Sequence, residues 1–350
     1  HFLQLVLQEG NTKMDSRVLD AYRDMAYINF IMADYNRSLS NLDKALEIAT
    51  LYDDIYSIKL MIADIYKETD MYDDALKILE DLQPKIKEEN TLYGKLLQMK
   101  CSILRILGDT DALAIAQKSE QLLIKMKDFE NLSETMNQAG IIYYTKGDVT
   151  NSLLCLDKSY KYAEKINNLA IMSKVSGNLG AIYHATGMIS KAQEFFDRSI
   201  QISKKISDQQ GYIAGCTNLG ILYLNKGLFD KAEILFNEAV EMSREISSRL
   251  NECIAVANIG EIMFKRGLDY KALEYYNRSF EIARELKVPI GEGIYHLSTA
   301  RMYIENKMDG NVRKMLDAAF KIFTEAEEVL YLSDCYRNKA LHEFMQGKIE

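Results

Sequence analysis

The hydrophobic positions of this 350-residue chain follow a helical rhythm. Apolar residues such as Phe236, Ala239 and Met242 recur every three to four positions, and this spacing predicts the buried face of an amphipathic helix. Equivalent residues 40 positions earlier and later continue the stripe: Phe196, Ser199 and Ile202, then Tyr276, Ser279 and Ile282. We therefore expect a series of similar helices, each with one face in the core.

A short phrase of polar, apolar and small residues recurs at the same interval. It reads Asn-Leu-Gly at 178–180 and 218–220 and Asn-Ile-Gly at 258–260, and each copy is followed by a second Gly and then an Ala. Self-similarity with such a period is typical of a solenoid, whose units bury their apolar faces by stacking on neighbours. The predicted fold class is all-α, an α-solenoid of stacked antiparallel helix hairpins with about eight to nine repeats.

The Gly after each phrase serves as a register mark for the whole chain. The marks are Ala33, Asp70, Gly108, Gly147, Gly187, Gly227, Gly267, Lys307 and Gly347, at intervals that grow from 37 to 40 residues. Seven residues before each mark stands a small residue, at Ala26, Ala63, Cys101, Gly140, Gly180, Gly220, Gly260, Ala300 and Ala340. On the second helices the small residues are Ala75, Ser152, Ala192, Ala232 and Ala272. Helices cross closely only where side chains are small, so each repeat is predicted to be a hairpin pinned at one crossing.

The helix boundaries are also predicted by local sequence. The mark Gly suits the left-handed residue that ends a first helix. Ser190 with Gln193, and Asp230 with Glu233, have the spacing of a capping box that starts a second helix.

These repeats divide the chain into segments of one continuous domain, residues 1–350. We expect residues 1–14 to be the tail of a preceding helix and 330–350 to be a partial repeat or a capping helix. The predicted repeats are 15–52, 53–89, 90–128, 129–168, 169–208, 209–248, 249–288 and 289–329. Because the chain begins at His1 rather than Met, we interpret it as an excised piece of a longer protein.

The Leu-Gly-x-x-Tyr, Gly and Ala series resembles the tetratricopeptide repeat across nearly the whole chain. The repeats depart from the family pattern because they are longer than the usual ~34 residues and contain no Trp. Their length resembles that of the repeats in kinesin light chains, Pins-type adaptors and many bacterial signalling proteins. The resemblance implies a right-handed solenoid whose first helices line a concave groove that binds a protein or peptide.

Charge and cysteine content restrict the partners and the cellular location that we expect. The net charge of -8 and the pI near 5.3 provide no basic field for a polyanion, so we expect no nucleic acid partner in this segment. There is no apolar run of membrane-spanning length, so we expect no membrane partner. The five cysteines are widely spaced without a Cys-x-x-Cys pair, which favours a reducing, cytoplasmic location.

One polar residue recurs where the resemblance places the concave groove. Asn178, Asn218 and Asn258 stand two residues before the small Gly. An Asn side chain offers an acceptor and a donor, which match the two polar groups of a peptide unit. With helices about 8 to 10 Å apart and an extended chain rising about 3.3 Å per residue, one Asn would meet every third ligand residue. Alternatively, these Asn side chains bond neighbouring helices or water.

The candidate protein- or peptide-binding residues combine this row with its surroundings in the implied groove. They are Asn137, Tyr144, Lys174, Asn178, His184, Asn218, Ile221, Leu224, Asn258, Phe264, Lys265 and Arg301. Apolar residues with scattered charges of both signs suit an amphipathic segment, either extended or helical. His184 has no partner in sequence and could equally be structurally idle.

No catalytic, cofactor-binding or metal-binding constellation is recognisable. The four histidines lie far apart and form neither a His-Glu-x-x-His pair nor a Cys/His metal spacing. Beside Asn218, the slots that a chaperone-binding carboxylate clamp needs hold Gly177, Ala181 and Ile254. We therefore expect no enzyme, no cofactor and no chaperone-tail ligand.

The sequence thus predicts an interaction module, the sensor or scaffold region of a larger cytoplasmic signalling or regulatory protein. One alternative is the regulatory domain of a bacterial quorum-sensing peptide receptor. An enzyme with its active site in the groove is a more distant one, and a homo-oligomeric scaffold stays open.

Overall fold

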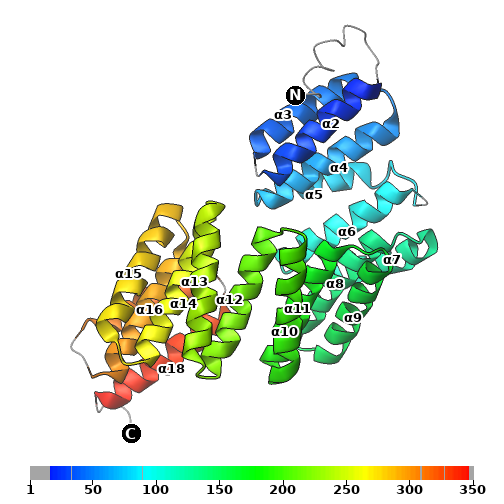
Figure 1. Ribbon diagram of the computed structural model, residues 1–350. Helices are drawn as coiled ribbons and strands as arrows, with labels where there is room; N and C mark the ends of the chain where they lie inside the picture. The colour runs from blue at the N-terminus through cyan, green and yellow to red at the C-terminus, as the bar shows by residue number, and fades with distance from the viewer. Residues whose placement is uncertain (1–15, 33, 89, 308–309, 327, 347–350) are drawn as a thin grey trace. The chain divides into compact units, whose positions relative to one another are not determined.

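The structure is a computed structural model that describes residues 16–32, 34–88, 90–307, 310–326 and 328–346, and these residues form helices joined by short turns, with no strand among them (Figure 1). The predicted tail at 1–14 and the marks Ala33 and Gly347 lie outside the described residues. The chain separates into two compact units, residues 1–171 and 172–350, and each is described by itself below.

Unit 1 is a stack of helix hairpins. Its helices are α2 (Ser16–Ile31), α3 (Tyr35–Ile48), α4 (Tyr52–Glu68), α5 (Tyr72–Leu82), α6 (Thr91–Ile106), α7 (Ala112–Met126), α8 (Phe129–Thr145) and α9 (Val149–Lys165). Consecutive helices pack on one another, and the first helices α4, α6 and α8 also contact one another. The core lies between the two helices of each hairpin and the next pair, with Leu79, Leu96 and Leu123 fully buried.

Unit 2 continues the same pattern. Its helices are α10 (Leu169–Ala185), which begins just before the division, α11 (Ile189–Lys205), α12 (Gln209–Asn225), α13 (Phe229–Glu245), α14 (Arg249–Lys265), α15 (Asp269–Leu286), α16 (Pro289–Glu305), α17 (Val312–Glu325) and α18 (Val329–Met345). Among the first helices, α12 contacts α14, α14 contacts α16 and α16 contacts α18, whereas each second helix packs mainly on the first helices beside it. The first helices are therefore the more closely spaced layer of this unit, which is the inner layer of a curved stack. The predicted all-α solenoid of stacked hairpins is confirmed.

Small residues at the helix crossings explain the recurrent Gly. A Cβ at position 180 would lie 2.5 Å from Cδ1 of Phe196, and one at position 220 would lie 2.6 Å from Cε1 of Phe236. Both rings are buried, as the apolar stripe predicts. The large aromatic residue of the second helix therefore fits only against a Gly on the first, because a side chain there would occupy the space of the ring.

The predicted left-handed turn at the end of each first helix is confirmed where the structure describes it. The backbone φ is +75° at Gly187 and +72° at Gly227, and it stays positive at Asp70 and Lys307, where the mark is not Gly. The sequence did not predict a second set of left-handed residues, which lie near the ends of second helices. These are Lys127, Asn167, Ser207, Ser247 and Lys287, and none of them is Gly.

The predicted capping boxes are wrong. α11 begins at Ile189 after Met188, α13 begins at Phe229 after Leu228, and neither N-cap residue makes a side-chain hydrogen bond. Ser190 and Asp230 therefore already lie within their helices. Side-chain caps occur instead elsewhere, for example at Asp208, whose carboxylate accepts a hydrogen bond of 2.9 Å from the backbone N–H of Gly211.

Candidate functional site

One face of unit 2 collects half of the twelve candidate binding residues that the sequence singled out. On α12, the side chains of Ala214, Asn218 and Ile221 lie three to four positions apart and reach solvent. The equivalent residues of the other first helices complete a surface that we call the first-helix face. Its members are Lys174, Asn178 and Ala181 on α10, Ala214, Asn218 and Ile221 on α12, Ile254, Asn258 and Glu261 on α14, and Ile294, Ser298 and Arg301 on α16.

The Asn row forms one level of this face. Asn178, Asn218 and Asn258 are all partly exposed, and Ser298 takes the same position on α16. The side-chain amide of Asn258 donates to the carbonyl of Ile254 on its own helix at 2.9 Å. That bond uses one of the two N–H donors of the Asn258 amide, so the side chain keeps one N–H and its carbonyl oxygen for a ligand.

The C-terminal end of the first-helix face is charged. The carboxylate of Glu261 forms an ion pair with Arg301, accepts a hydrogen bond of 3.0 Å from the Tyr276 hydroxyl, and lies 3.8 Å from the Lys265 ammonium. Burial, and then the charge of Glu261, raises the pKa of Tyr276 above its usual range. The guanidinium of Arg301 and the Lys265 ammonium also lie over the ring of Phe264. These contacts fix the charged side chains in place at one end of the surface.

The remaining predicted site residues have different settings. Leu224 is partly exposed, and the His184 Nε2 atom lies 3.2 Å from the Asn225 amide nitrogen of the following first helix. Phe264 is buried, and its ring contacts the Lys265 and Arg301 cations rather than lying open to a ligand. Asn137 and Tyr144 lie on α8 in unit 1, where Tyr144 is exposed but Asn137 has no exposed surface. Asn137 is therefore not accessible to a ligand in this structure, because its position faces the core.

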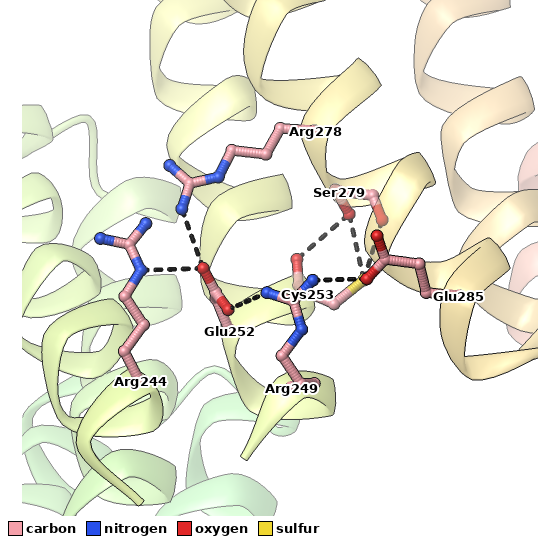
Figure 2. Close-up of polar contacts among 7 residues, drawn as sticks. All are labelled: Arg244, Arg249, Glu252, Cys253, Arg278, Ser279 and Glu285. Carbon is pink, nitrogen blue, oxygen red and sulfur yellow. Dashed lines mark hydrogen bonds and ion pairs between the residues drawn. The ribbon is translucent and has the colours of Figure 1, made fainter. Parts of the chain in front are cut away.

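A second polar cluster, which the sequence reasoning missed, joins α13, α14 and α15 (Figure 2). The Glu252 side chain is only 3% exposed, yet its carboxylate contacts Arg244 at 2.9 Å, Arg249 at 2.6 Å and Arg278 at 2.8 Å. Arg249 also contacts Glu285 at 2.6 Å. Burial raises the pKa of Glu252, but the hydrogen bonds and charges of Arg244 and Arg249 outweigh burial and hold it below the usual value.

The sequence did contain a signal for this cluster. The positions equivalent to Glu252 in earlier repeats hold Leu132, Met172 and Tyr212, so an acidic residue stands where the others are apolar or aromatic. In the preceding hairpin the Tyr212 hydroxyl contacts Glu238, which occupies the position of Arg278. A charged residue at a position that is apolar or aromatic in the other repeats therefore indicates a buried ion pair. Adjacent acidic residues on an exposed helix face do not indicate one.

The described residues contain no group of His, Cys, Asp or Glu side chains that could hold a metal ion. Within the same residues, no helix is both long and apolar enough to cross a membrane. All five cysteines are buried free thiols. Burial raises the pKa of the Cys101 thiol to about 12, against the opposing charge of Arg105, so this thiol stays protonated and is a poor nucleophile.

Residues 170–245 and 212–285 match the family model described as tetratricopeptide repeat. No curated protein matches the sequence significantly. Among solved structures, the quorum sensor NprR from B. thuringiensis is 13% identical with a TM-score of 0.68, and the match covers 95% of this chain and 94% of that chain. A Rap protein complexed with Competence and Sporulation Factor is 13% identical with a TM-score of 0.63, over 96% of this chain and 100% of that chain.

A signal transduction ATPase with numerous domains and a tetratricopeptide repeat sensor, from Pyrococcus horikoshii, is 15% identical with a TM-score of 0.65. That match covers 96% of this chain but only 54% of the other, so the chain spans about half of its length. At these identities the structural matches show the fold, and the family match rests on the repeats of unit 2. Residues 170–285 thus match the tetratricopeptide repeat family, and the fold of the described residues is similar to that of these repeat structures.

Proposed function

We propose that this chain binds a protein or peptide segment on the first-helix face of unit 2, as the sensor or scaffold region of a larger cytoplasmic signalling protein. The observation that carries the proposal is the row of Asn178, Asn218 and Asn258, three partly exposed side chains at one level of consecutive first helices. The free thiols of all five cysteines support a reducing compartment.

The chemistry around this row favours an extended segment. The row is flanked on one side by Ala181 and Ile221 and on the other by Ala214 and Ile254, so small or apolar side chains border the polar line. A peptide backbone lying along the row would donate its N–H groups to the Asn oxygens, and its carbonyl groups would accept from the Asn amides, since the Asn258 amide keeps one N–H beyond its bond to Ile254. Apolar ligand side chains would then rest on Ile221, Leu224 and Ile254.

Positive side chains stand at both ends of the face. Lys174 is exposed at the α10 end, and the Glu261, Lys265 and Arg301 cluster lies at the other. That cluster holds two cations against one carboxylate, so both ends favour acidic ligand residues. We infer that a ligand with acidic residues at its ends and apolar residues along its length fits best.

A second candidate is a receptor for a short signalling peptide. The observation in its favour is the match along the whole length of the Rap protein, which is complexed with Competence and Sporulation Factor, and along most of the quorum sensor NprR. A receptor of this kind would bind a short peptide alone, whereas a scaffold needs a folded or longer partner. The two candidates therefore differ in the length of the shortest ligand that binds.

The test begins with selection of binders from a random linear peptide library displayed on phage, with the purified 350-residue chain as the target. Hydrogen exchange of the chain with and without a selected peptide then locates the bound surface. We expect slower exchange in α10, α12 and α14 and unchanged exchange in α11 and α13. Protection confined to second helices or to unit 1 would refute the proposed location.

Truncation of the selected peptide separates the two candidates. A peptide receptor keeps its affinity when the ligand is cut to about six residues, the length that spans two Asn positions. A scaffold loses affinity steadily with each residue removed. A peptide that fits either candidate should bind the wild-type chain and should bind the Lys174→Glu variant more weakly. If the library yields no such peptide, the result counts against both candidates.

A further inference from the structure

Two arginines of the Glu252 cluster share a single carboxylate oxygen. The Arg244 Nε atom and the Arg278 Nη2 atom lie 2.9 and 2.8 Å from the same Oε1 atom of Glu252. Arg249 contacts the other oxygen, Oε2, and also contacts Glu285. Figure 2 shows the first two guanidiniums on one side of the Glu252 carboxylate and that of Arg249 on the other. Two positive groups from different helices are therefore held side by side.

Both of these arginines keep donors that reach solvent. A guanidinium has several N–H groups, and in the described part of the chain Arg244 hydrogen-bonds through Nε and Arg278 through Nη2. Their side chains are 47% and 42% exposed, whereas the Glu252 side chain is 3% exposed. The buried carboxylate therefore fixes two guanidiniums in place while their remaining N–H groups stay open to an anion.

The cluster carries an excess of positive charge. Its three guanidiniums contact two carboxylates, which leaves one positive charge without a counterpart. Arg244 and Arg278 also repel each other, and the one carboxylate that they share offsets only part of this repulsion. An anion bound between their free N–H groups would neutralise the excess charge and relieve the repulsion.

The fold itself does not require this cluster. Leu132 and Met172 take the position of Glu252 in earlier repeats, and the same hairpin forms around them. An apolar side chain at a buried position stabilises a protein as well as a buried ion pair does, because the ions must first lose their water. The arrangement of arginines around Glu252 therefore points to a ligand rather than to stability.

We propose that Arg244 and Arg278 form a binding site for a phosphate monoester or free phosphate, whose oxygens bridge the two guanidiniums. Arginine binds phosphate through paired N–H groups, and two arginines match the double charge of such a group better than that of a singly charged carboxylate. The site is separate from the first-helix face, because position 252 lies about 200° around α14 from the exposed Ile254.

Titration calorimetry of inorganic phosphate into the 350-residue chain tests the site, with sodium chloride of the same ionic strength as the blank. Arg244→Gln and Arg278→Gln should each raise the dissociation constant about tenfold or more. Arg284 is the matched control, because it is exposed at the position of Arg244 one repeat later, where Ala318 replaces the second arginine. Arg284→Gln should bind phosphate as the wild type does.

Folding of each variant is checked by circular dichroism, because Arg278 also holds a buried carboxylate. Arg278→Lys keeps a cation beside Glu252 but removes the paired N–H groups. It should fold as the wild type does and still weaken phosphate binding about fivefold. Full affinity in a folded Arg278→Lys protein would refute recognition by the guanidinium.

A library of random peptides with one central phosphoserine distinguishes a phosphorylated partner from a free phosphate. For a phosphorylated partner, selected peptides should bind at least about tenfold tighter than inorganic phosphate and lose that affinity in Arg278→Gln. For a free phosphate compound, they should bind no tighter than phosphate itself.

The proposal is overturned if neither phosphate nor any phosphoserine peptide binds, or if Arg284→Gln weakens binding as much as Arg278→Gln does. Peptide binding that Lys174→Glu weakens and Arg278→Gln leaves unchanged belongs to the first-helix face. The two binding proposals therefore succeed or fail separately.

Discussion

Ser173 on α10 and Ser199 on α11 each donate a hydroxyl hydrogen bond to the other's backbone carbonyl, at 3.0 and 2.9 Å. The same reciprocal exchange, at the same separation of 26 residues, joins Ser133 to Ser159 and Cys253 to Ser279. Each hairpin therefore combines two features. A small residue permits close approach at the crossing, and about two helical turns away a pair of short polar side chains ties the two backbones together.

Removal of one partner should destabilise the array. Ser199→Ala removes the donor to the Ser173 carbonyl in a buried setting, and we expect a loss of about 1–3 kcal/mol in the free energy of unfolding. Urea unfolding followed by circular dichroism measures it. Ser190→Ala, at an exposed position on the same helix, is the matched control and should change stability by less than ~0.5 kcal/mol. Equal effects of the two substitutions would argue that the exchange contributes nothing.

Two glycines on α10 should respond oppositely to the same substitution. Gly180→Ala places a methyl group 2.5 Å from the Phe196 ring and should destabilise by about 1–3 kcal/mol. Gly177→Ala meets only the Ser199 hydroxyl oxygen at 3.6 Å, an ordinary contact. It should stabilise by about 0.5–1 kcal/mol, since Ala is the better helix former. Thermal unfolding of both variants decides the matter, and a stable Gly180→Ala protein would contradict the packing account.

The Glu252 cluster should make the free energy of unfolding depend on pH in the acidic range. Its folded-state pKa is below the unfolded value near 4.5, so its contribution is complete above that pH and is lost as pH falls through the folded pKa. Glu252→Gln should reduce stability at pH 7 by about 1–3 kcal/mol, because three arginines lose a charged acceptor. The gap between wild type and variant should shrink steadily below about pH 4.5. A gap that stays constant with pH would show that the charge of Glu252 is irrelevant.

The thiols should be unreactive in the native protein. Burial raises the pKa of Cys101 to about 12, and that of Cys216 and Cys335 to about 11. At pH 8 we therefore expect negligible reaction of the folded chain with Ellman's reagent and full reaction after unfolding in guanidinium chloride. Because these thiols ionise only in the unfolded chain between about pH 9 and 11, stability should also fall as pH rises through that range. A rapidly reacting native thiol would contradict the buried positions.

The repeat pattern was sufficient to predict the fold. The interval between repeats, the small residues and the turn positions are all set by the crossing of the two helices in each hairpin. The buried Phe196 and the left-handed Asp70 follow directly from that register. The capping boxes at Ser190 and Asp230 were wrong because both residues lie within the first turn, where a polar residue resembles a cap in sequence, while the N-cap residues Met188 and Leu228 are apolar.

The polar contacts were harder to predict than the fold. Glu252 is buried only because arginines from two other helices meet it, and such pairings between distant positions leave little local trace in a sequence. For the same reason, burial of Asn137 depends on how neighbouring helices cover it. The binding residues of the first-helix face stay a prediction, since nothing in the fold itself requires Asn at positions 178, 218 and 258.

Titration calorimetry of a library-selected peptide into wild-type chain and into the triple variant Asn178→Ala, Asn218→Ala and Asn258→Ala tests the central claim most directly. The double variant Gln201→Ala and Asn237→Ala, which removes exposed amides from second helices, is the matched control. We predict at least about a tenfold rise in the dissociation constant for the triple variant, since two or three hydrogen bonds are lost. The control should bind as wild type. Unchanged affinity in a folded triple variant would contradict the claim that the Asn row holds the ligand.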